Sequence, residues 1–277
     1  MQKQNKKKRG IGALLAITSI TACLVASTFA KYTTTGAAGG SARVAKFGIE
    51  LTVEDKTTFN TTYAPNSPEA TAAGIETFVR SEDETAVVAP GTGEKDAITF
   101  KIKGKSETVV SLKAAIEPIA GKDLYEEIFL KEGQYKDYTT SPYTGNFQVE
   151  TGGYYPVVFT LTDKSNNSTL ATGDLYEINT FLEETLNKTT FNPGEAIDKT
   201  FSLSWKWASK GTGENAAAIN SADTLLGNLA ADKTKYVKSK YPDTGSEFSN
   251  LEEGTDYSTN ISFNLKLSVD QAFEGPI

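Results

Sequence analysis

The stretch Phe201–Trp207, FSLSWKW, decides the fold class of this chain. Its large apolar side chains recur at every second position, with serine or lysine between them. A period of two is typical of a β-strand with one buried face, because successive strand side chains point to opposite sides of a sheet. Four large side chains on one face predict a strand packed in a core, and a ligand platform is the less favoured alternative.

The same alternation extends outward from this stretch in both directions. It predicts strands over residues 44–53, 75–80, 85–89, 98–103, 110–116, 147–150, 155–162, 169–171 and 261–269. The strand at 44–53 is expected to be the first core strand, with Phe47, Ile49, Leu51 and Val53 on its apolar face. Strands 98–103 and 110–116 are expected to form a hairpin across a turn at Gly104–Lys105, and residues 55–74 a polar surface loop. This pattern predicts an all-β fold, an antiparallel β-sandwich or jelly roll.

Two short helices are expected in the connections. Asp174 followed by Glu177 matches a capping box, in which each residue binds the other's backbone N–H, and an apolar stripe follows. A second, weaker pattern covers residues 222–238 and contains Gly227.

The first thirty residues are predicted to be a signal peptide. Five basic residues lie among the first ten, and residues 11–30 carry no charge. Thr28 and Ala30 are small enough for a signal peptidase, so cleavage is predicted between Ala30 and Lys31. Two alternatives stay open. The apolar run is long enough for an uncleaved anchor, and Cys23, the only cysteine, follows Ile20–Ala22 as the acylated residue of a lipoprotein would.

The exported part is expected to have two regions. Residues 31–42 are rich in Thr, Gly and Ala and predict a flexible N-terminal segment, while residues 43–277 predict a single β-sandwich domain with long loops. The C-terminal residues lack a sortase-type LPxTG signal, so covalent attachment to the wall is not expected.

Charge and composition narrow the function classes. Without the leader, 23 basic residues stand against 35 acidic ones, a net charge of −12, so nucleic acid is not an expected partner. Histidine is absent, which removes the commonest general base and the commonest transition-metal ligand. We therefore predict no catalytic residue, no metal site and no cofactor, and we do not expect an enzyme.

Acidic residues leave two alternatives open. The pairs Glu126–Glu127, Glu183–Glu184 and Glu252–Glu253 could serve a two-carboxylate glycosidase, but adjacent side chains point apart and a solvated surface is favoured. The run Asp163–Asn167 could offer oxygen ligands to calcium, but a hairpin turn is favoured.

Several short motifs, in order, resemble the TasA/camelysin family of secreted matrix-fibre proteins. They are the leader ending Thr28-Phe29-Ala30, the strand Ala42–Leu51, the turn Val88–Gly91 before Ile98–Lys103, and the closing run from Asn260–Leu265 to Phe273. The resemblance covers both ends and the first third of the chain. It implies a jelly-roll subunit of an extracellular or biofilm-matrix fibre, released by a dedicated signal peptidase.

The resemblance also implies how such a subunit assembles. In TasA-like fibres the freed N-terminal segment of one subunit lies as an extra strand in the next. On this chain the donor is expected within residues 31–42, with Tyr32, Thr33, Thr34 and Thr35 as its strand-forming part. The expected partner is a second copy of the chain, in a head-to-tail polymer, with the cell wall or other matrix components as further candidates. Camelysin is described as a metalloprotease, but without histidine no family catalytic residue carries over.

An alternative function comes from the tyrosines. Tyr135, Tyr138, Tyr143 and Tyr154 lie in turn-rich segments and could stack on sugars, as in an exported, monomeric adhesin or carbohydrate-binding module.

Overall fold

The computed structural model describes residues 43–55, 57–139, 145–231 and 251–272. The described chain is mostly antiparallel β-structure with few, short helices, as the alternation predicted. No helix within these ranges is long and apolar enough to cross a bilayer. The sheets pack as a β-sandwich, whereas the jelly-roll form of the prediction is not established.

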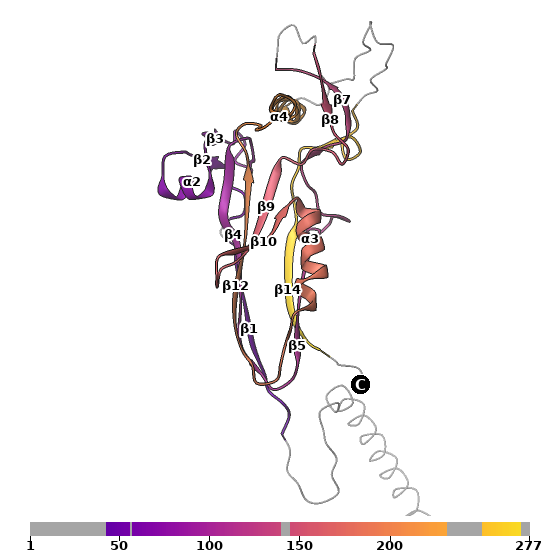
Figure 1. Ribbon diagram of the computed structural model, residues 1–277. Helices are drawn as coiled ribbons and strands as arrows, with labels where there is room; N and C mark the ends of the chain where they lie inside the picture. Colours follow the sequence, from indigo (N-terminus) through magenta and orange to yellow (C-terminus); the bar gives the residue numbers. More distant parts are fainter. Residues whose placement is uncertain (1–42, 56, 140–144, 232–250, 273–277) are drawn as a thin grey trace, which may run out of the picture.

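The larger layer is a five-stranded sheet in the order β1-β4-β12-β9-β10 (Figure 1). Its strands are β1 (Phe47–Asp55), β4 (Thr92–Ser106), β12 (Ala196–Trp207), β9 (Val157–Asp163) and β10 (Ser168–Gly173). The prediction for FSLSWKW is confirmed, because Phe201, Leu203, Trp205 and Trp207 are each at most 5% exposed. Phe201 pairs with Phe100 of β4, and their rings stack with centroids 5.2 Å apart. The aromatic strand therefore lies at the centre of the sheet.

The second layer is a three-stranded sheet in the order β11-β5-β14. It contains β11 (Thr190–Phe191), β5 (Val110–Glu117) and β14 (Asn264–Gln271). In Figure 1, β14 and β5 lie on the right, β12, β4 and β1 lie on the left, and the two layers meet at the bottom. Phe263, just before β14, packs edge-to-face on Phe159 of β9 at 5.5 Å, which joins the layers in one core.

The predicted hairpin of residues 98–103 and 110–116 is wrong. β4 and β5 form as strands, but β4 pairs with β1 and β12, and β5 pairs with β11 and β14. Gly104 and Lys105 lie inside β4, and the chain passes between layers at residues 107–109. Both strands have a buried apolar face. Because the strands belong to different layers, these faces pack toward each other across the core, and the strands do not lie side by side in one sheet.

The helix α3 (Leu175–Glu184) begins as predicted. The Asp174 side chain accepts a hydrogen bond from Glu177 N at 2.8 Å, and the Glu177 side chain accepts one from Asp174 N at 3.2 Å. The second helix, α4 (Ala216–Ala231), begins six residues earlier than expected, and its predicted end lies outside the described residues. Asp223 anchors it, since its Oδ1 accepts from Tyr154 Oη at 2.6 Å and from Trp207 Nε1 at 3.0 Å.

The remaining elements are short. They are β2 (Thr62–Tyr63), α2 (Pro68–Ala73), β3 (Val79–Arg80), β6 (Phe129–Leu130), β7 (Gly133–Lys136), β8 (Asn146–Val149), η2 (Leu186–Lys188) and β13 (Tyr257–Ser258). The expected surface loop at 55–74 therefore contains a strand and a helix, and Tyr63 is only 2% exposed. Of the strand expected at residues 75–80, only β3 at Val79–Arg80 forms. The strand expected at residues 85–89 is absent.

Gly104 is required for β1 to pair with β4. Its φ of +142° favours glycine, and a Cβ there would collide with the carbonyl oxygen of Gly48. We expect Gly104→Ala to lower the free energy of unfolding by about 2 kcal/mol, measured by urea denaturation. Gly121→Ala is the matched control, because φ is +88° there and a Cβ would meet nothing within 4 Å. Equal losses in the two variants would contradict the collision.

Candidate assembly surface

β1 is an edge strand with one unpaired side. Its nine residues pair with β4 along their whole length, from Phe47 opposite Ser106 to Asp55 opposite Ile98. No strand within the described ranges pairs with its other side. An unpaired edge offers a row of free N–H and C=O groups to another strand. β1 is thus a template for main-chain hydrogen bonds.

The apolar face of β1 is only partly covered, which corrects the prediction of a core strand. Ile49 packs against the core, but the other three side chains of this face are exposed. Phe47, Leu51 and Val53 are 49%, 36% and 52% exposed. Residues paired across an antiparallel ladder share one face, and Ile102 and Phe100, the partners of Leu51 and Val53, are 0% and 1% exposed. The exposed side chains therefore point to the core side of the sheet, and the second layer stops short of them.

β14 forms the matching edge of the second layer. Its inner residues Leu265, Leu267 and Val269 are only partly buried, and β5 is its only partner in the described chain. The opposite edge of β5 is occupied by β11 and by α3 and η2, whose Asn179 and Asn187 accept from Ile116 N at 2.7 Å and Ala114 N at 2.5 Å.

Helix α3 places both open edges on the same side of the sandwich. It contacts β10 and β9 as well as β5. The edge of the second layer next to α3 therefore lies over β10 and β9, at one edge of the first layer. The other edge of the second layer, β14, then lies on the same side as β1. We call these two open edges together the open flank. The side chains on their inner faces are Phe47, Leu51 and Val53 of β1 and Leu265, Leu267 and Val269 of β14.

One end of the open flank is closed by the connection between β4 and β5. Glu107 N donates to Lys46 O at 2.9 Å, and Ala272 N donates to Val109 O at 3.0 Å. The start of β1 and the end of β14 are therefore held by residues only two positions apart. β1 begins at this end and runs away from it, whereas β14 runs toward it and ends there.

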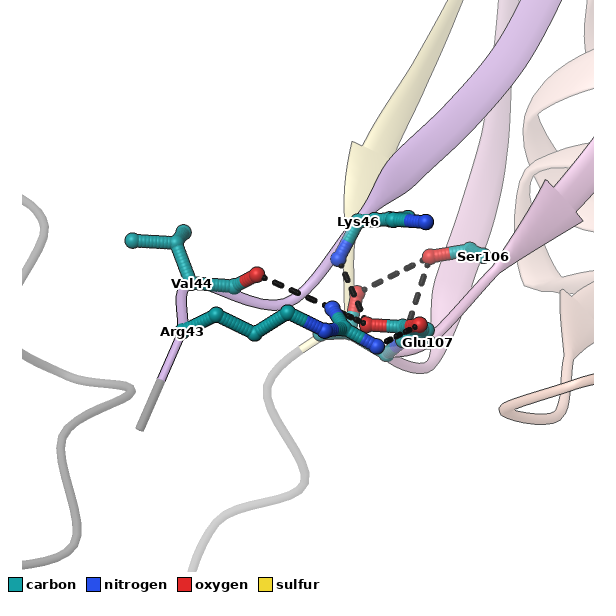
Figure 2. Close-up of polar contacts among 6 residues, drawn as sticks. Arg43, Val44, Lys46, Ser106 and Glu107 are labelled. Carbon is teal, nitrogen blue, oxygen red and sulfur yellow. Dashed lines mark hydrogen bonds and ion pairs between the residues drawn. The ribbon is translucent and has the colours of Figure 1, made fainter. Parts of the chain in front are cut away.

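Arg43 and Glu107 fix the place where the chain enters β1 (Figure 2). The guanidinium donates to both carboxylate oxygens, at 2.5 and 2.6 Å, and Lys46 N donates to Oε2 at 2.9 Å. The Arg43 hydrogen bond and that of Lys46 N lower the pKa of Glu107 to about 2. The carboxylate thus stays charged at any ordinary pH, and the root of the N-terminal segment keeps a fixed position.

The predicted N-terminal features lie outside the described residues. They are Cys23, the cleavage site at Ala30 and Lys31, and the candidate donor residues Tyr32, Thr33, Thr34 and Thr35. The structure thus shows an unpaired strand edge, which the sequence did not locate, and it describes the chain from Arg43 onward.

The tyrosines predicted to bind sugar do not form one platform. Tyr135 is 4% exposed, with its ring stacked on Phe147 and its hydroxyl donating to Lys131 O. Tyr154 is partly buried and donates to Asp223, Tyr138 lies under the Lys136 ammonium, and Tyr143 is outside the described residues. The three of these tyrosines that the structure describes offer no shared aromatic face.

The acidic pairs follow the prediction with one exception. Glu183, Glu184, Glu252 and Glu253 are exposed and Glu126 is partly so, but Glu127 is only 8% exposed. Its carboxylate accepts from Leu175 N, the first residue of α3, at 3.0 Å. Burial raises the pKa of Glu127 to about 8, and the nearby Asp174 and Glu177 add to the shift.

No acidic cluster in the described chain is suited to a metal. No three acidic or cysteine side chains in the described ranges are placed so that they could hold one metal ion together. At the proposed alternative calcium loop, Asp163 Oδ1 instead accepts from the N–H and hydroxyl of Ser165, which forms the turn between β9 and β10. The hairpin interpretation of this run is confirmed.

Comparison with protein-family models and with curated proteins finds no match, so the resemblance to the TasA/camelysin family remains a prediction from the sequence.

Proposed function

We propose that this chain is a secreted structural protein, the subunit of a cell-surface or matrix fibre that grows by insertion of an N-terminal donor strand into the next subunit. The observation that carries the proposal is the open flank. It combines two unpaired strand edges with apolar side chains that the described part of the chain leaves exposed on β1 and only partly buried on β14. The proposed role is structural and needs no catalytic group.

A strand added to the flank would gain in two ways. It would hydrogen-bond to the main chain of an edge strand, the mode of recognition known as β-augmentation. It would also cover Phe47, Leu51 and Val53, each between about a third and a half exposed. At about 25 cal/mol per Å² of apolar area, completing the burial of three such side chains contributes about 3 kcal/mol. The net contribution of the main-chain hydrogen bonds adds to this.

The donor segment has the required length. Residues 31–42 number twelve, and at about 3.3 Å per residue they span about 40 Å when extended. β1 has nine residues and is about 30 Å long by the same measure. The small residues Ala37–Ser41 suit the crossing between subunits. Residues 31–36 then remain for the added strand, and they span about 20 Å, about two thirds of the edge.

The position of the root favours open growth. The donor leaves its own domain at Arg43, beside one end of its own flank, while the acceptor edge lies along β1 and β14. Donor and acceptor are different surfaces, so the contact is heterologous and head-to-tail, and such contacts extend into filaments unless they close into a ring.

The same segment is too short to fill its own flank through a local hairpin. Gly39–Gly40 suits a tight turn, but a two-residue turn there would pair residue 38 with residue 41 and residue 31 with residue 48. The segment would then reach only the first two residues of its own β1 (Phe47–Asp55). Under the proposal, the donor therefore lies on the flank of a neighbour.

The test is electron microscopy of protein that begins at Lys31. We expect negatively stained filaments from this form. A form that begins at Ser41, which lacks residues 31–40, is expected to be a folded monomer by circular dichroism and sedimentation.

Two results would contradict the proposal. Filaments of equal yield from the shortened form would exclude the N-terminal donor. A concentrated sample of the longer form that stays monomeric would exclude assembly through this segment.

A further inference from the structure

A second surface, remote from β1, has the character of a ligand site. An open cleft of about 840 Å³ lies at the N-terminus of α3, in the size range of ligand pockets. It is lined by residues before and within β6, by Tyr155 two residues before β9, by Tyr176 in the first turn of α3, and by residues between 253 and 260. Its apolar wall consists of Leu124, Tyr125, Phe129, Tyr155 and Tyr176.

The aromatic wall is exposed and partly fixed in place. Tyr176 is 68% exposed and Tyr155 is 37% exposed. The Tyr155 ring stacks on Phe129 at 6.0 Å with an interplanar angle of 29°, so its orientation is held from behind. Tyr176 sits on α3, whose capped first turn fixes its backbone. Two exposed rings on rigid supports form a pre-organised stacking surface.

The polar groups of the cleft are oxygen-rich. Asp123, Glu126, Glu253 and Asn260 lie around it. Its one cation, Lys122, is already paired with Glu126, which also accepts from Ser262 Oγ at 2.9 Å. A phosphate, sulfate or uronate would therefore enter without a free cation and against several carboxylates, which is unfavourable.

We propose that this cleft binds a neutral glycan, through the apolar faces of pyranose rings stacked on Tyr155 and Tyr176 and sugar hydroxyls bonded to the carboxylates around them. A pyranose ring presents a C–H face and a rim of hydroxyl groups. The first matches an aromatic ring, and the second matches acceptors such as carboxylate and amide oxygens. The proposal does not depend on polymerisation, since the cleft is complete within one subunit.

Glu127, a buried residue of the cleft lining, fits this ligand. It is 8% exposed and accepts a hydrogen bond from the backbone N–H of Leu175. Because burial raises its pKa to about 8, the group is largely protonated at neutral pH and can both donate and accept. A hydroxyl group needs both a donor and an acceptor, whereas a cation would be served better by an ionised carboxylate.

The test is calorimetric titration of the full chain in mild detergent with four neutral hexasaccharides: cellohexaose, xylohexaose, laminarihexaose and chitohexaose. At least one is expected to bind with a Kd below about 1 mM. Tyr176→Ala is expected to weaken that binding about tenfold, and Tyr176→Phe, which keeps the ring, to restore most of it. Phe78→Ala is the matched control, because Phe78 is a 63% exposed aromatic residue that does not line the cleft.

Three outcomes would overturn the proposal. The first is no binding by any of the four glycans. The second is binding that Tyr176→Ala leaves unchanged. The third is binding of hexalysine to this cleft, lost in Tyr176→Ala, without glycan binding, which would identify a cation site built from rings and carboxylates.

Discussion

A subunit that carries Val53→Lys is expected to fold normally and to remain monomeric where the unaltered protein forms filaments. Val53 is 52% exposed on the inner side of β1, so a lysine there reaches water in the monomer. Under a donor strand its ammonium group would lie in an apolar, unpaired position. A buried, unpaired charge costs several kcal/mol, so association is expected to weaken at least about a hundredfold.

Val158→Lys is the matched control. Val158 is 42% exposed on β9, between Val157 and Phe159, which are both 0% exposed and point inward. Its side chain therefore faces outward from the same sheet, away from the open flank. This variant is expected to form filaments in normal yield, as judged by sedimentation and negative staining. Loss of filaments in both variants would indicate a general effect of the added charge.

Mixing two defective subunits separates donor from acceptor. The Val53→Lys subunit keeps its donor segment but has a damaged flank, whereas the subunit lacking residues 31–40 keeps the flank but has no donor. Neither polymerises alone under the proposal, and an equimolar mixture is expected to give a one-to-one heterodimer. Filaments in the mixture, or no complex at all, would contradict donor-strand insertion.

Much of the fold was predictable because it depends on local patterns. The alternation in FSLSWKW placed β12, and the Asp174–Glu177 capping box placed the start of α3. Such signals come from neighbouring residues, which share one strand face or one helix turn. They identify elements without identifying the partners of those elements.

The errors concern partners. β4 and β5 have the pattern of a hairpin, but each finds its neighbours far along the chain, and the turn expected at Gly104 is a close approach to β1. Likewise, the alternation over 44–53 predicted which side chains of β1 share a face. Whether that face is covered depends on the position of β14, which begins more than 200 residues after β1 in the sequence.

The candidate surfaces were the least predictable part. The candidate donor residues were named from a resemblance, but the unpaired edge proposed to accept them depends on the order of two sheets. The aromatic cleft gathers Tyr125, Tyr155 and Tyr176 from three segments, and no local pattern links them. Of the pair Glu126–Glu127, only Glu127 is buried, because α3 begins next to it and Leu175 N donates to its side chain. The sequence around Glu127 does not indicate this contact.

Glu127→Gln is expected to remove a pH dependence of stability, the second large effect. The folded pKa of Glu127 is about 8, whereas the unfolded group titrates near its ordinary 4.5. Between these values the folded protein holds a proton that the unfolded chain has released, so the free energy of unfolding falls as pH rises from about 4.5 to 8. At 1.36 kcal/mol per unit, the loss reaches about 5 kcal/mol at most.

The variant isolates this term because glutamine stays neutral and can still accept from Leu175 N. Urea denaturation is expected to give equal stability for both proteins near pH 5, and a variant more stable by several kcal/mol at pH 8.5. Glu126→Gln is the control. The pKa of Glu126 is lowered, chiefly by its hydrogen bond from Lys122, so its contribution is lost only below its ordinary range. If the free energy of unfolding of Glu127→Gln still fell with rising pH as steeply as that of the wild type, another group would be responsible for the pH dependence.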